Sequence, residues 1–229
     1  MLRKNRFIGA ALLALLISGC TVDKKIYDMI ARIEKRLDII EKIVLPPKED
    51  AQQSAFNIPV AKSPILGKAD AKNSIIVFTN YQCQFCARAD AMLREALKDK
   101  DLKEEVNLVF KHFPFDRHHM ARPASKAAMA AQEQGKFWDM TEIIFANQKD
   151  LSPENIQVWA QKIGLDMNKF NADLKANDEK YELQIKEDMK LGEEAQLQGT
   201  PLILIGGWPF DPAKIDAASI KAFIKAKGL

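Results

Sequence analysis

The chain has 229 residues, of which 47% are hydrophobic and 28% are charged, and its formal net charge at pH 7 is +3. This length supplies one domain with a sizeable core and leaves room for insertions. Acidic and basic residues are interspersed, and no basic patch is interleaved with aromatic residues, so we expect no nucleic-acid partner. With three cysteines in all, the chain cannot be a scaffold held together by several disulfides.

Residues 1–19 have the pattern of a signal peptide. Basic residues precede an apolar run from Phe7 to Ile17 that is too short to span a bilayer. Residues 16–20, LISGC, resemble a bacterial lipobox, which implies cleavage before Cys20 and lipidation of its sulfur. The alternatives are a plain secretory signal and an uncleaved anchor. We therefore expect the mature chain in the periplasm or cell envelope, anchored to a membrane by lipid, where disulfide chemistry has substrates.

Residues 20–45 are predicted to form an amphipathic helix. Its apolar residues alternate at spacings of four and three, as in a coiled-coil seam: Ile26, Ile30, Ile33, Leu37, Ile40 and Val44. Isoleucine at the d positions favours three strands over two, so we expect a homo-oligomer and favour a trimer. The alternative is a helix that packs on its own domain or on the membrane surface. A polar segment led by Pro46 and Pro47 then predicts a linker over residues 46–64.

Two cysteines, Cys83 and Cys86, follow an apolar, β-branched run that begins at Ser74 and predicts a buried strand, and residues 87–97 have the period of a helix. Unpaired N–H groups and the dipole at a helix N-terminus stabilise an anion, so Cys83 is the predicted nucleophile. Cys86, one turn further in, is predicted to resolve the mixed disulfide. The alternatives are a static disulfide and half of a metal site. Because no histidine stands at a convincing ligand spacing, we expect no metal.

The remaining elements follow in the order strand, helices, strand, strand, helix. Residues 106–113 predict a second core strand that Pro114 ends, and helical patterns fill residues 118–197. Pro201 opens a short apolar strand over residues 202–205, a further strand lies around residues 208–210, and residues 217–227 predict the closing helix. The fold class is therefore α/β, with a helical insertion between two halves.

The motif FTNYQCQFC, with Gly199-Thr200-Pro201 far downstream, resembles the DsbA family of thioredoxin-like thiol–disulfide oxidoreductases over about residues 65–229. The resemblance implies a thioredoxin-like fold and a cis peptide bond at Pro201 beside the cysteines, although spacing alone favours an ordinary trans proline. It also implies substrate contacts for Phe85, Thr200 and Pro201, and no cofactor beyond the redox-active Cys83–Cys86 disulfide.

The chain departs from the family pattern at Val77 and Asn80, where many relatives carry acidic residues. A buried acid helps to move the proton of the resolving thiol, so we expect proton handling to differ in this chain.

The resemblance implies disulfide exchange, by isomerisation or oxidation, in cysteine-containing secreted proteins, with a membrane redox partner. Thr200, Phe85 and the N-terminal helix resemble isomerase-type relatives more than strict oxidases. A surface lipoprotein that uses the same fold as a binding or chaperone module is the alternative from another class, since fold does not fix function. A glutathione-linked isomerase is a further alternative, but such enzymes usually need a single active-site Ser or Cys.

Overall fold

The computed structural model describes residues 24, 29–30, 32–33, 35–36 and 55–229. The chain divides into two units, Met1–Gln53 and Ser54–Leu229. The described residues of the first unit are helical, and the side chains of Met29 and Ile33 are exposed there. The signal peptide, Cys20, most of the heptad positions and residues 46–54 of the linker lie outside the described residues, so the coiled coil and the lipid anchor stay predictions.

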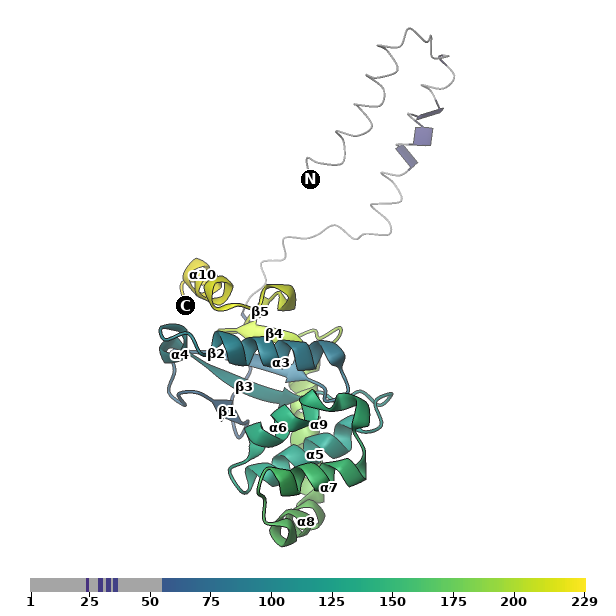
Figure 1. Ribbon diagram of the computed structural model, residues 1–229. Coiled ribbons are helices and arrows are strands. Elements are labelled where there is room, and N and C mark those ends of the chain that lie inside the picture. Colours follow the sequence, from purple (N-terminus) through teal and green to yellow (C-terminus); the bar gives the residue numbers. More distant parts are fainter. Residues whose placement is uncertain (1–23, 25–28, 31, 34, 37–54) are drawn as a thin grey trace. The chain divides into compact units, whose positions relative to one another are not determined.

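The second unit is built on a five-stranded sheet with the order β1-β3-β2-β4-β5 (Figure 1). The strands are β1 (Ile65–Leu66), β2 (Asn73–Thr79), β3 (Val106–His112), β4 (Leu202–Ile205) and β5 (Trp208–Phe210). β2 and β3 run parallel, whereas the other neighbouring strands are antiparallel. The central strand β2 is largely apolar because both of its faces are covered by other elements.

Helices α3 (Gln84–Ala96) and α10 (Ala217–Lys227) pack with one face of the sheet, and Figure 1 shows α3 lying along it. Leu93 of α3 and Ile224 of α10 share a buried cluster with Ile75 of β2. A short helix, α4 (Leu102–Glu105), leads into β3. Ile76 and Phe78 of β2 belong to a separate buried cluster, because successive side chains of a strand point to opposite faces of the sheet. The sheet is therefore buried on both sides.

A helical insertion separates β3 from β4. It comprises α5 (Ala121–Gln132), α6 (Phe137–Ala146), the 3-10 helix η1 (Gln148–Asp150), α7 (Pro153–Lys162), α8 (Met167–Ala176) and α9 (Asp178–Glu194). These helices lie within the predicted range of residues 118–197. Helix α7 begins at Pro153, and the Ser152 hydroxyl accepts a hydrogen bond from the Asn155 N–H at 3.1 Å, which caps the helix.

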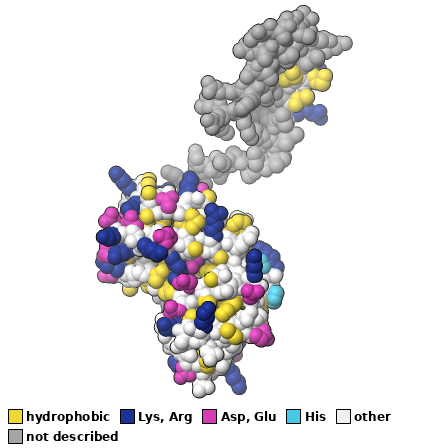
Figure 2. Space-filling view, in the orientation of Figure 1, with side chains coloured by type: hydrophobic (Ala, Val, Ile, Leu, Met, Phe, Trp, Pro, Cys, Tyr) yellow, Lys and Arg dark blue, Asp and Glu magenta, His cyan; other side chains and the backbone are white. Residues whose placement is uncertain are grey.

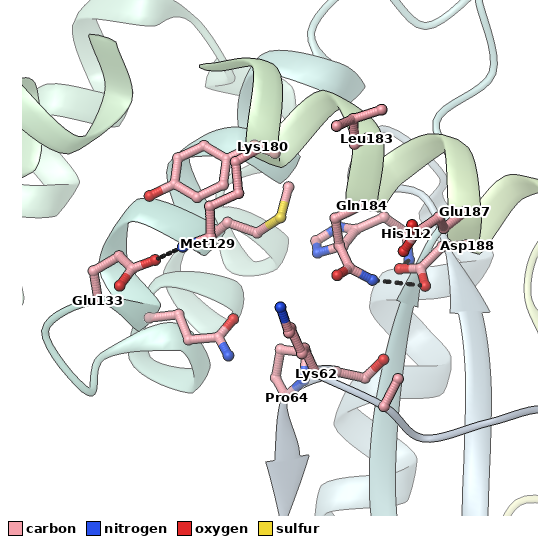
Figure 3. A pocket seen from close by; sticks show the side chains of 14 residues that line it. Lys62, Pro64, His112, Met129, Glu133, Lys180, Leu183, Gln184, Glu187 and Asp188 are labelled. Carbon is pink, nitrogen blue, oxygen red and sulfur yellow. Dashed lines mark hydrogen bonds and ion pairs between the residues drawn. The ribbon is translucent and has the colours of Figure 1, made fainter. Parts of the chain in front are cut away.

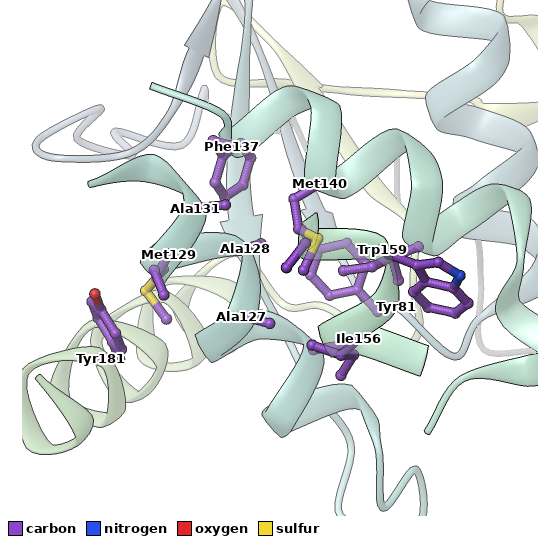
Figure 4. Packing of buried hydrophobic residues seen from close by; sticks show 14 of the residues in the cluster. Tyr81, Ala127, Ala128, Met129, Ala131, Phe137, Met140, Ile156, Trp159 and Tyr181 are labelled. Carbon is purple, nitrogen blue, oxygen red and sulfur yellow. The ribbon is translucent and has the colours of Figure 1, made fainter. Parts of the chain in front are cut away.

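The insertion has its own hydrophobic core. Alanines of α5 let the neighbouring helices approach closely, and Figure 4 shows Met140, Trp159 and Tyr81 gathered around Ala127 and Ala128. Tyr81 comes from the loop that precedes α3, and Cys86 of α3 belongs to the same cluster. The core of the insertion is therefore continuous with the region around the two cysteines.

The structure differs from the predicted boundaries at two places. The active-site helix begins at Gln84 rather than residue 87, so Cys86 lies within its first turn. Residues 55–64, assigned to the linker by their sequence, pack on the second unit: the Phe56 N–H donates to the Gly207 carbonyl at 2.8 Å, and Ile58 and Pro64 are buried. Most residues of this segment are apolar, but Pro59 and Pro64 interrupt them and they follow neither a strand nor a helix period, so periodicity gives no sign of this packing.

Two surface features of the described residues bear on location and partners. On the face shown in Figure 2, acidic and basic side chains are interspersed over the second unit rather than gathered by sign. None of the helices in the part of the chain that the structure describes is both long enough and apolar enough to cross a membrane.

Candidate active site

Cys83 and Cys86 lie where the chain passes from β2 into α3. A turn forms because the Cys83 N–H donates to the Asn80 carbonyl at 3.0 Å and the Asn80 side chain accepts from the Gln82 N–H at 2.9 Å. Cys83 is then the N-cap of α3, with extended backbone angles. Both cysteines are free thiols; Cys83 is half-buried, and Cys86 is only 1% exposed. The two sulfurs therefore lie in different environments although they are close in the sequence.

The surroundings of Cys83 favour its thiolate. The pKa of Cys83 is lowered to about 5, chiefly by the hydrogen bond from the Cys86 thiol and further by Thr200 and by the backbone N–H groups of Cys86 and Phe85. Partial burial works in the opposite direction. Both N–H groups belong to the first turn of the helix, where the sequence predicts donors to an anion, and the Cys86 N–H also donates to the Cys83 carbonyl at 3.0 Å. Cys83 is therefore a thiolate at neutral pH, the form that attacks disulfides.

The surroundings of Cys86 favour its thiol. Burial is the largest cause of a strongly raised pKa, and the hydrogen bond to the Cys83 thiolate adds to it, whereas Thr79 and Thr200 lower it. Cys86 thus keeps its proton and donates a hydrogen bond to Cys83. The opposite pKa shifts are those that a nucleophile and a resolving thiol need, and these two roles stay predictions.

The loop before β4 lies against Cys83. The Thr200–Pro201 peptide bond is cis, and Cys83 Sγ lies 3.3 Å from the Thr200 carbonyl oxygen. This contact spans 117 residues and arises because β4 is antiparallel to β2, with Leu202 opposite Phe78. The backbone of Thr200 is thus beside the sulfur, where the sequence resemblance places it.

Phe85 is the exposed aromatic residue of this site. Its side chain is 63% exposed although it follows the nucleophile by only two residues. A single exposed apolar side chain is ordinary on a protein surface, so it is the position of Phe85 beside Cys83, at the start of α3, that makes it a candidate contact for a substrate. Of the site residues named from the sequence, Cys83, Cys86, Phe85, Thr200 and Pro201 come together here, and Cys20 lies outside the described residues.

A family model described as Thioredoxin matches residues 60–226. The chain belongs to the thioredoxin family. Its fold is similar to that of oxidised BdbD from Bacillus subtilis, with a TM-score of 0.66 and 22% identity, in a match that covers 76% of this chain and 96% of the other. It is also similar to the thiol-disulfide exchange protein alpha-DsbA2 from Wolbachia pipientis, with a TM-score of 0.62 and 22% identity over 72% of this chain and 86% of the other. A linker-deletion mutant of ScsC from Proteus mirabilis matches with a TM-score of 0.58 and 19% identity over 99% of this chain and 96% of the other.

Curated relatives are much longer proteins. The chain is 29% identical over 168 residues to the Na(+)/H(+) antiporter NhaA 3 of Salinispora tropica, covering 71% of this chain and 25% of that protein. A second relative, the Na(+)/H(+) antiporter NhaA of Herminiimonas arsenicoxydans, is 32% identical over 114 residues, covering 48% of this chain and 17% of the other. This thioredoxin-family chain thus spans about a quarter or less of these two relatives.

Residues of the insertion hold the active-site loop of this thioredoxin-family chain in place. Gln148 Nε2 donates to the carbonyls of Tyr81 at 2.6 Å and Cys83 at 3.0 Å. Gln82 Oε1 accepts from the Met120 N–H at 2.6 Å, just before α5. The sequence reasoning missed these glutamines, because a polar side chain in a loop leaves no periodic signal.

A pocket among the described residues lies away from the cysteines. It has a volume of about 680 Å³ and is lined by residues 61–64, α5, α9 and His112 (Figure 3). His112 is buried, and neither ring nitrogen has a partner among the described residues. Burial, and then the charge of Lys111, lowers its pKa to about 3, so the ring is neutral. Lys180 pairs with Glu133 at the pocket wall, at 2.7 Å. Neither cysteine lines this pocket, so it is not part of the candidate active site.

The described residues hold no group of three or more His, Cys, Asp or Glu side chains arranged to bind a metal ion.

Proposed function

We propose that the chain is an extracytoplasmic thiol–disulfide oxidoreductase that exchanges disulfides in secreted or envelope proteins through Cys83 and Cys86. The observation that carries the proposal is that the pKa of Cys83 is lowered whereas that of Cys86 is raised. Cys83 is a half-buried thiolate at a helix N-terminus, beside the Thr200 carbonyl, and Cys86 is a buried thiol that donates to it. A static disulfide needs no such difference in proton affinity.

The proposed reaction has two displacements. The Cys83 thiolate attacks one sulfur of a substrate disulfide, and the other substrate sulfur leaves as a thiolate. Cys86 then loses its proton and attacks the Cys83 sulfur, which releases the remaining substrate thiolate and leaves the Cys83–Cys86 disulfide. The substrate gains two electrons and the enzyme loses two. Oxidation of a substrate dithiol is the same sequence in reverse.

The substrate that fits this site is an extended peptide segment. The Thr200 backbone, beside Cys83 and next to the cis peptide bond at Pro201, offers main-chain hydrogen bonds to such a segment, and pairing of this kind reads little of its sequence. Phe85, at the start of α3, adds an exposed apolar surface near the sulfur. We therefore propose that Phe85, Thr200 and Pro201 bind unfolded or partly folded cysteine-containing proteins.

The first experiment tests the roles of the two cysteines with insulin as the substrate disulfide. We expect Cys83→Ser to abolish insulin reduction and Cys86→Ser to accumulate a mixed disulfide on Cys83, detectable by mass spectrometry after acid quenching. Insulin reduction that survives Cys83→Ser would refute the assignment of the nucleophile. A wild-type protein that binds insulin without reducing it would favour the binding or chaperone module instead.

We propose that the N-terminal helix forms a homo-oligomer, with a trimer favoured, and that this oligomer sets the balance between isomerase and oxidase activity. A lipid anchor at Cys20 and a membrane redox partner are further parts of the proposal. We favour the isomerase. Its test is the reduction potential of the Cys83–Cys86 pair against glutathione, measured on protein with and without residues 21–47. A potential near roughly −120 mV that is unaffected by the deletion, with no effect on substrate repair, would indicate an oxidase. Loss of scrambled-substrate repair on deletion, together with loss of the trimer in sedimentation, would indicate the isomerase.

A further inference from the structure

A small cavity lies directly behind Cys86. Its volume is about 10 Å³, at the lower limit for one water molecule, and its wall contains Cys86, Thr79 and Asp90. The other five lining side chains, from β2, β3 and α3, are apolar. Asp90 follows Cys86 by four residues on α3, a spacing that places two side chains next to each other on one face of a helix. A carboxylate and a buried thiol thus line the same small cavity.

Asp90 is largely covered by its neighbours and is held in one orientation. Its side chain is 11% exposed, and Arg94 Nε donates to its Oδ2 at 2.7 Å. Arg94 is held in turn by the Trp138 carbonyl, to which its Nη2 donates at 3.2 Å. Among the described residues no hydrogen bond is made to Asp90 Oδ1, so this oxygen is open to receive a proton.

The other titratable groups near the cavity do not offer a base. Tyr81 has a raised pKa because it is buried, and its hydroxyl is engaged with Thr141 Oγ1 at 2.8 Å. His112 lies tilted against Tyr81, with 6.2 Å between ring centroids, and does not line the cavity. Glu142 pairs with Arg94 from a side chain that is 71% exposed. Asp90 is the carboxylate in the wall of the cavity.

The second displacement of the proposed function requires a group of this kind. Cys86 is buried and holds its proton strongly, yet it must become a thiolate to attack the Cys83 sulfur. Val77, which lines the cavity, and Asn80 of the preceding turn are both buried, and neither side chain is a base. A proton leaving Cys86 therefore needs another acceptor within reach.

We propose that Asp90 accepts the proton of Cys86 when Cys86 attacks the mixed disulfide. The S–H bond of Cys86 breaks, its electron pair forms the new bond to Cys83 Sγ, the substrate thiolate leaves, and the proton ends on Asp90. In the reverse direction the carboxylic acid returns the proton to Cys86 as the Cys83–Cys86 bond breaks. No other reactant is needed. This inference rests on the proposed function and adds the route of the proton.

The environment of Asp90 is consistent with this role. Burial is the largest influence on its pKa and raises it, the Arg94 charge and hydrogen bond lower it, and the Glu142 charge raises it slightly. A carboxylate with a raised pKa is a better match to a thiol, and proton transfer is most effective when the two pKa values approach each other. Arg94 is therefore a positioning residue that also sets the pH at which Asp90 becomes a base.

The test separates the two displacements in time. Reduced full-length protein is mixed with oxidised glutathione, samples are quenched in acid, and the mixed disulfide on Cys83 is quantified by mass spectrometry over a range of pH. In Asp90→Asn we expect formation of the mixed disulfide at an unchanged rate and its resolution slowed by about 10²-fold or more, the usual contribution of general acid–base catalysis. The pH limb that belongs to Asp90 should disappear from the resolution rate.

A second variant distinguishes proton transfer to Asp90 from a merely structural effect of replacing it. Arg94→Met keeps the packing on the Trp138 ring but removes the cation that lowers the pKa of Asp90, so we expect the same pH limb to move to higher pH rather than vanish. Glu142→Gln, at an exposed neighbour of Arg94, is the matched control and should leave resolution within about twofold of wild type, because its charge is the smallest influence on Asp90.

Two further outcomes separate the inference from the function on which it rests. Equal resolution rates and equal pH profiles in Asp90→Asn and wild type would overturn the role of Asp90 and leave the disulfide exchange intact. Failure of wild-type Cys83 to form any mixed disulfide would overturn the proposed function itself.

Discussion

Replacing Cys86 by alanine tests how the low pKa of Cys83 arises. The largest single cause is the hydrogen bond that the Cys86 thiol donates to the Cys83 thiolate. A hydrogen bond to a charged group contributes about 1.5–3 kcal/mol, and S–H is a weak donor, so the lower end of the range applies. Since about 1.36 kcal/mol corresponds to one pKa unit, Cys86→Ala should raise the pKa of Cys83 from about 5 to about 6.

The pKa is measured from the pH dependence of alkylation by iodoacetamide and from the ultraviolet absorbance of the thiolate. The backbone N–H groups of the first turn and Thr200 remain in the variant, so the pKa should stay well below that of a free thiol. Cys86→Ser keeps a hydroxyl donor and is the matched control, with a smaller increase expected. A pKa unchanged in Cys86→Ala would show that the helix terminus and Thr200 stabilise the thiolate without Cys86 and would refute the reasoning.

Three further predictions concern stability and position. Reduced protein should gain stability to urea as pH rises from about 6.5 toward about 8.5, because the folded state has released the Cys83 proton that the unfolded chain keeps. Below about 6.5 the buried, neutral His112 gives a slope of the same sign, so the comparison is made above that pH. Cys83→Ser should lose the slope above about 6.5, and its persistence there would contradict the assignment. Gln148→Leu should lower the free energy of unfolding by about 1–3 kcal/mol, since two carbonyls of the active-site loop lose their donor, while Gln148→Glu, which restores no N–H, should not rescue it. Gly192→Ala should destabilise by about 1–3 kcal/mol, because its Cβ would lie 2.6 Å from a phenylalanine ring, whereas Gly199→Ala, with open space around it, should not.

Local features of the sequence were predictable because their causes are local. The apolar run of β2, the cysteine spacing and the helical period after Cys86 each depend on residues close in the chain, and the structure confirms the thioredoxin-like fold with a helical insertion. The start of α3 was placed three residues late, since Gln84 and Phe85 give no helical period by themselves. The start of a helix depends on the turn that precedes it, and here Asn80 forms the turn that leads to the N-cap Cys83.

Contacts between distant residues could not be derived from periodicity. The approach of Thr200 to Cys83 depends on β4 pairing with β2, and the resemblance to a family, not the spacing, was what anticipated it. The double hydrogen bond of Gln148 and the burial of Asp90 had no signal at all, because a charged residue in a helix is ordinarily exposed. Asp90 is covered only when α3 packs on the sheet and Arg94 reaches the Trp138 carbonyl of α6.

The low pKa of Cys83 links nucleophilicity to redox potential. Stabilising the thiolate stabilises the reduced pair, and a couple whose reduced form is more stable is a stronger oxidant. The same stabilisation keeps Cys83 ready to attack, which an isomerase requires. Raising the pKa of Cys83 by one unit costs the reduced form about 1.4 kcal/mol and should lower the potential by about 30 mV. Residues at the active site therefore adjust both properties together, and it is the N-terminal helix that should separate an isomerase from an oxidase: its deletion is expected to leave the pKa and the potential unchanged while it abolishes disulfide repair.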